Sequence, residues 1–170
     1  MSVEKSIHYI APEDASRLID VVVERVKVGD IPSVVVASRK GNAAVSLGKA
    51  LEGSAGVVSV TEFTYSEGVK KAMKKQKVTA VEKADLPIQD RRMMREALEM
   101  FGSGVKAALE VASIAAEKGL ASGKTLAVAG GRGALDTALV VRPAAPADLT
   151  DPDPKKRMAV LEILALPVDS

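Results

Sequence analysis

The sequence contains no cysteine and no tryptophan, and only one of its 170 residues is histidine. Without cysteine, the chain cannot form a disulfide, a thiolate nucleophile, an iron–sulfur cluster or a cysteine-based zinc site. The single histidine, His8, cannot build a multi-histidine metal site, and any histidine-based catalytic triad would have to use it. We therefore expect no metal centre, and we assign no role to His8.

Aromatic residues, excess charge of one sign and long apolar runs are also scarce. The net charge of +2 is too small to indicate a partner. No apolar run is long enough for a transmembrane helix, and the first residues lack the apolar stretch of a signal peptide. We therefore expect a cytoplasmic protein without a membrane partner. A stacking platform for single-stranded nucleic acid is not expected either, because the chain has only four scattered aromatic residues, Tyr9, Phe63, Tyr65 and Phe101.

Small apolar residues are abundant. Apolar residues make up 47% of the chain, and 49 of its residues are alanine or valine. This composition favours a core in which the elements approach one another closely. The length predicts one domain that spans residues 1–170.

Strand and helix patterns alternate along the chain. Short valine-rich runs of the kind buried on both faces of a sheet alternate with helical spacing of apolar residues. We predict strands at 7–10, 33–37, 57–61, 78–81, 125–129, 138–141 and 158–166, and helices at 12–28, 43–51, 67–76 and 91–118, the last interrupted at 102–104. The alternation predicts an α/β fold, a three-layer α/β/α sandwich with a mostly parallel sheet. The strand at 138–141 should run antiparallel, because the loop before it is too short for a helical crossover.

Ligands of such sheets bind beyond the carboxyl ends of the strands, which directs attention to two loops. The first comprises Ser38, Arg39, Lys40, Gly41 and Asn42, between the strand at 33–37 and the following helix. A hydroxyl, two cations and a glycine at a helix N-terminus suit an anion, most plausibly a phosphate. The alternative interpretation is an ordinary turn with a polar cap.

The second loop follows the strand at 125–129 and is rich in glycine. Its glycines and arginine suit a backbone cradle for an anion or a planar ring, although they do not match a dinucleotide fingerprint. The alternative is a wide turn between two strands, which the loop taken alone favours. Its candidate residues are Gly130, Gly131, Arg132, Gly133, Asp136 and Thr137.

Two groups of charged residues allow further interpretations. Lysines cluster on the helix at 67–76, and arginines follow at 91–95. A solvated helix face explains them better than a nucleic-acid site, because the total charge is nearly balanced. Lys106 and Glu110 lie four residues apart on a helix. They could form a catalytic couple, but an ordinary helix pair is the simpler interpretation.

Two segments resemble the pyruvate kinase C-terminal α/β domain. Residues 31–61 resemble its first strand, phosphate loop and helix, and residues 123–143 resemble its closing strand, glycine loop and strand. The similarity is closer to stand-alone archaeal and bacterial proteins built on this domain. It rests on a VVAS-x-x-G-x-A loop at 35–44, an F-G-x-G-x-K-x-x-x-E junction at 101–110, and D-T-A and R-P-A at 136–138 and 142–144.

The chain also departs from the pattern of this group. Residues 12–16 lack the usual P-G-x-x-N-T-like segment. The segment 63–90 is shorter and lacks an H-T-G-F-type turn, and the glycine loop is one residue short. Because these segments line the pocket in the group, its ligand need not transfer to this chain.

The resemblance implies the fold of that domain and a small phosphate-bearing ligand, either flavin mononucleotide (FMN) or a sugar phosphate. In pyruvate kinases the first loop holds a phosphate of the allosteric sugar bisphosphate, and the second closes over the sugar. By this comparison the first loop of the chain would hold the phosphate and the second would contact the rest. FMN is the only cofactor that the resemblance implies. The scarcity of aromatic residues favours a plain phosphate ligand over a flavin.

We therefore expect a cytoplasmic ligand-binding or regulatory protein. The catalytic barrel of pyruvate kinase is absent, so that activity is not expected. One alternative is an enzyme that acts on a phosphorylated metabolite, with Lys106, Glu110 or Asp136 as acid–base groups. Another is an interaction module, for nucleic acid or protein, that uses the lysines at 70–77. The sequence is compatible with a homo-oligomer and does not indicate the oligomeric state.

Overall fold

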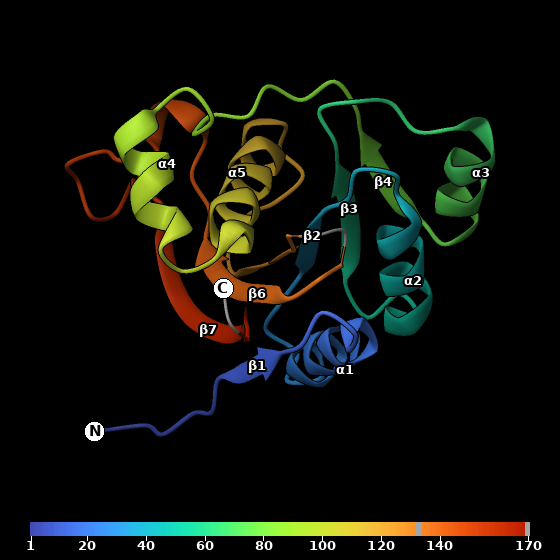
Figure 1. Cartoon of the computed structure of the whole chain (residues 1–170), viewed down its shortest axis with the longest axis horizontal. Helices are drawn as coiled ribbons and strands as arrows, with labels where there is room; N and C mark the ends of the chain where they lie inside the picture. The colour runs from blue at the N-terminus through green and yellow to red at the C-terminus, as the bar shows by residue number, and fades with distance from the viewer. Residues whose placement is uncertain (132–133, 169–170) are drawn as a thin grey trace.

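The computed structural model describes residues 1–131 and 134–168, which form seven strands in one sheet and five α-helices (Figure 1). The strand order is β1-β7-β6-β5-β2-β3-β4. The strands are β1 (His8–Ile10), β2 (Ser33–Ala37), β3 (Gly56–Val60), β4 (Val78–Val81), β5 (Thr125–Ala129), β6 (Thr137–Arg142) and β7 (Ala159–Pro167).

Helices cover both faces of the sheet (Figure 1). One face carries α1 (Ala15–Val26), α2 (Asn42–Leu51) and α3 (Glu67–Lys75), and the other carries α4 (Arg92–Glu99) and α5 (Ser103–Glu117). The valine run of β2 shows why both faces need cover. Val34 and Val36 pack toward the first set of helices, while Val35 packs toward α5. The predicted α/β/α layers are therefore confirmed.

The direction of β6 also agrees with the prediction. β6 runs antiparallel to its neighbours β5 and β7, and every other neighbouring pair in the sheet is parallel. β2, β4 and β5 have the predicted bounds. The long helix is interrupted as predicted, although the break between α4 and α5 lies at 100–102 and not at 102–104. The proline-rich segment after β6 contains a short 3₁₀ helix, Pro146–Asp148. In the described part of the chain, no helix is long and apolar enough to cross a membrane.

Helix α5 packs closely against the sheet at Gly104. Ten of its fifteen residues are buried. A Cβ on Gly104 would lie 2.1 Å from Oγ1 of Thr137, at the start of β6. Small side chains therefore allow a contact distance that larger residues would prevent.

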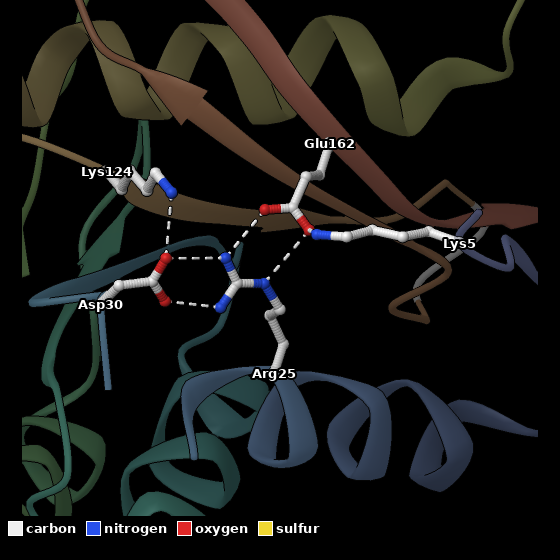
Figure 2. A network of polar contacts seen from close by, with 5 residues as sticks. All are labelled: Lys5, Arg25, Asp30, Lys124 and Glu162. Atoms are coloured by element: carbon white, nitrogen blue, oxygen red, sulfur yellow. Dashed lines mark hydrogen bonds and ion pairs between the residues drawn. The ribbon is translucent and has the colours of Figure 1, made fainter. Parts of the chain in front are cut away.

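Five charged residues form a network at the amino ends of β2 and β5 (Figure 2). Arg25 of α1 lies at its centre and pairs with Asp30 at 2.6 Å and with Glu162 of β7 at 2.8 Å. Lys5 Nζ lies 2.9 Å from Glu162, and Lys124 Nζ lies 3.0 Å from Asp30. The network joins α1 and β7 to the N-terminal segment and to the turns that precede the two central strands.

The network should make stability depend on pH. The Arg25 guanidinium lowers the pKa of Glu162 from 4.5 to about 2, and it also holds the pKa of Asp30 below its usual range. Folding therefore favours the ionised carboxylates. Their stabilising contribution is present above about pH 4.5 and is lost as the pH falls toward 2.

We expect Glu162→Gln to lower the free energy of unfolding at pH 7 by about 1–2 kcal/mol, between the values for exposed and buried charged pairs. The difference from the unmodified protein should shrink as the pH falls from 5 to 2. Urea unfolding at several pH values measures it. Glu24→Gln is the control, since that side chain is 80% exposed. A pH-independent difference would contradict the assignment to this carboxylate.

Candidate functional site

A cavity of about 350 Å³ lies at the carboxyl ends of the central strands. From β2 the chain continues through β3 and β4 on one side, then returns through α4 and α5 to β5 on the other side. Open α/β sheets bind ligands at the point where the strand order reverses in this way, beyond the carboxyl ends of the strands. The ends of β2 and β3, the segment after β4, the first half of α5 and the glycine after β5 line this space, which we call the switch-point cavity.

The first predicted loop lines the cavity with only two of its five residues. Ser38 and Arg39 line it, whereas Lys40 and Asn42 are exposed outside the lining. Gly41 is buried against α3, where a Cβ would lie 2.5 Å from Cε of Met73. Its φ of +89° is the left-handed conformation that favours glycine. Gly41 therefore shapes the loop through its packing against α3.

Tyr65 fixes the loop between β2 and α2 through hydrogen bonds. Its hydroxyl donates to the carbonyl oxygen of Ser38 at 2.9 Å and lies 2.7 Å from the hydroxyl of Ser59. The Ser38 hydroxyl accepts the N–H of Gly41 at 3.0 Å. Burial raises the pKa of Tyr65, so the phenol stays protonated and can donate this bond. The resulting bonds fix the loop immediately before α2.

Arg39 supplies the cation at the rim of the cavity. Its guanidinium lies 4.7 Å from the ring centroid of Phe63, which is half exposed. Its carbonyl oxygen accepts the Thr61 hydroxyl at 3.3 Å. Among the described residues no carboxylate lies within 4.0 Å of the Arg39 guanidinium. Its charge is therefore available to an anion.

Lys106 and Glu110 extend from α5 into the same cavity. Lys106 Nζ lies 2.9 Å from Glu110 Oε1, an ion pair without hydrogen-bond geometry, and also donates to Oε1 of Gln89. The other Glu110 oxygen accepts the backbone N–H groups of Ile88 and Gln89 at 3.0 and 3.1 Å. Glu110 is completely buried. The carboxylate therefore anchors the segment after β4 and holds Lys106 at the cavity wall.

The second predicted loop divides between two cavities. Gly130 lines the switch-point cavity, whereas Gly131 and Asp136 line a separate cavity of about 220 Å³ beside the N-terminus of α5. Asp136 accepts the hydroxyl of Thr137 at 2.7 Å. A Cβ on Gly130 would lie 1.6 Å from the carbonyl oxygen of Ala134, so the loop's own backbone requires this glycine. Arg132 and Gly133 lie outside the described residues.

The predicted basic residues do not form one surface. The lysines of α3 and the arginines of α4 lie on opposite faces of the sheet, near opposite ends of the molecule (Figure 1). Lys70 is partly neutralised by Glu82, whose carboxylate lies 3.2 Å away. The N–H of Tyr65 and then Lys70 hold the pKa of Glu82 below its usual range.

Sequence reasoning missed the contribution of the segment after β3. Thr61, Glu62 and Phe63 all line the cavity. They follow a strand that pairs with β2 in parallel, so their position beyond its carboxyl end resembles that of Ser38. The segment 61–63 contains neither the glycine nor the cations that selected the first loop, so its position after a central strand was the only signal that could have found it.

The comparison with known families gives no name for the site. No protein-family model matches the chain. The resemblance to the pyruvate kinase C-terminal domain stays a prediction from the sequence.

Proposed function

We propose that the chain binds a small phosphate-bearing ligand in the switch-point cavity, in a binding or regulatory role. The observation that carries the proposal is the position of Arg39 at the rim, without a carboxylate partner among the described residues and next to the N-terminus of α2. Guanidinium groups bind phosphate oxygens in bidentate fashion. Ser38 adds a buried hydroxyl to the same wall.

The ligand's remaining atoms would meet a mixed wall. Val60, Leu86 and Val111 form its apolar part, and Lys106 contributes an ammonium group. The volume of about 350 Å³ is within the range of small-molecule sites. FMN and a sugar phosphate are the two ligands that we propose. A flavin ring would contact aliphatic side chains and Phe63.

Arg39→Ala is expected to weaken binding by about 10- to 100-fold, the effect of losing a charge-assisted hydrogen bond. Isothermal titration with FMN, fructose 1,6-bisphosphate and inorganic phosphate measures it. Lys40→Ala is the matched control, because it removes the same charge from an exposed neighbour outside the cavity.

Two results would contradict the proposal. One is the absence of binding by all three compounds at millimolar concentration. The other is equal weakening by the two variants, which would indicate a general electrostatic attraction. Flavin absorbance of the protein as purified would favour FMN over the sugar phosphate.

A second candidate function is an enzyme that acts on a phosphorylated metabolite. The observation in its favour is that Lys106 and Glu110 line the same cavity as Arg39, although Asp136 lines another. Lys106→Met tests it. An enzyme that uses this ammonium group as an acid would lose turnover and keep substrate affinity, whereas a binding protein would lose affinity alone.

A further inference from the structure

Helix α4 carries an apolar stripe on its outer face. Its inner residues Met94 and Leu98 pack against α5, and no residue of α4 is buried. On the outer face Met93 is 85% exposed and Met100 is 78% exposed, and Ala97 lies between them in sequence. α4 lies at the edge of the molecule, outside α5 (Figure 1). α4 therefore has two apolar sides. The inner side is covered by α5, and the outer side is exposed.

The spacing makes this stripe continuous. Met93, Ala97 and Met100 are four and three residues apart, so they lie in one line on the helix. Phe101, which is half exposed, extends the line at its end. An exposed helix face is normally polar, whereas methionine and aromatic residues are enriched at protein interfaces.

The charges of α4 indicate which partner fits the stripe. Arg91 and Arg92 lie at its N-terminal end and Glu99 lies at its C-terminal end, whereas Glu96 lies in the middle of the helix. Arg92 and Glu96 pair at 3.0 Å along one side of the stripe. An antiparallel copy of the same helix would therefore place Glu99 of one copy near Arg92 of the other at both ends, while Glu96 keeps Arg92 of its own chain as its partner.

We propose that two copies of this chain associate along α4, antiparallel and related by a two-fold axis. The axis lies next to Ala97, so that Met93 meets Met100 of the partner subunit and Arg92 lies near the partner's Glu99. Such an isologous contact is the commonest form of homodimer interface. The eight residues of α4 span about 12 Å. The contact is small, so the dimer dissociates on dilution.

Sedimentation velocity between about 10 µM and 1 mM tests the proposal, over the range where weak association is populated. The unmodified protein should shift from monomer to dimer, and Met100→Glu should remain monomeric. Val28→Glu is the control, because Val28 is a 71% exposed apolar residue outside α4. It should dimerise normally. Circular dichroism establishes that each variant is folded.

Charge reversal tests the orientation. Arg92→Glu and Glu99→Arg should each weaken the dimer, because each places like charges across the axis. The double variant should restore it, because both charges are exchanged. A monomer at 1 mM, a dimer that persists in Met100→Glu, or a double variant no better than the single ones would overturn the proposal.

Discussion

Glu110→Ala is expected to lower the free energy of unfolding by about 3–5 kcal/mol, the effect of removing one partner from a buried ion pair. The carboxylate is completely buried, and its loss would leave two backbone N–H groups, of Ile88 and Gln89, without their acceptor. Lys106 would lose its ion-pair partner at a wall where its side chain is only 12% exposed. Urea unfolding at pH 7 measures the effect.

Two further variants separate the causes of this loss. Glu117→Ala, on the same helix but exposed, should change stability by less than about 0.5 kcal/mol. Glu110→Gln keeps an oxygen acceptor for the two N–H groups and loses the ion pair, so its stability should be intermediate. A loss below 1 kcal/mol for Glu110→Ala would show that the segment after β4 is held by other contacts.

The second large effect is expected at Gly41. Gly41→Ala should destabilise the protein by about 2–4 kcal/mol, because the left-handed backbone and the lack of space each contribute. The new Cβ would lie 2.5 Å from Cε of Met73 and 2.6 Å from Cγ1 of Val69. Thermal or urea unfolding measures the loss.

Gly53→Ala is the matched control for Gly41→Ala. Gly53 has a similar φ of +82°, but nothing lies within 4 Å of its Cβ position. It should lose only the backbone contribution, about 1–2 kcal/mol. Equal losses for the two variants would show that Met73 and Val69 move aside without cost.

A bulky residue at position 41 would disturb the fold, so Arg39→Ala is the sharper test of ligand binding.

The sheet could be predicted from the sequence because its strands carry a simple signal. Runs such as 33–37 and 125–129 are short, rich in valine or alanine and bounded by polar or glycine residues, which is typical of strands buried on both faces. The antiparallel direction of β6 followed from the length of one loop. These features are local, so no knowledge of distant contacts was needed.

The sequence did not predict in the same way which residues of the two loops line the switch-point cavity. Whether Gly41 faces a ligand or α3 depends on where Met73 and Val69 lie after α3 packs beside α2. Likewise, Lys106 reaches the same cavity as Arg39 only because α5 lies across β2 and β5. Such placements depend on contacts between segments far apart in the chain, which periodicity does not encode.

The central position of β2 and β5 has a consequence for the order of assembly. These strands pair side by side, with Ser33 opposite Thr125, although the two are 92 positions apart in the sequence. Closing so long a loop costs conformational entropy before any contact compensates it, so this pairing should be a late and slow event in folding. β2, β3 and β4 are joined by short crossovers and can assemble earlier. The switch-point cavity would then form late in folding, and a bound ligand would slow unfolding by holding β2 and β5 together.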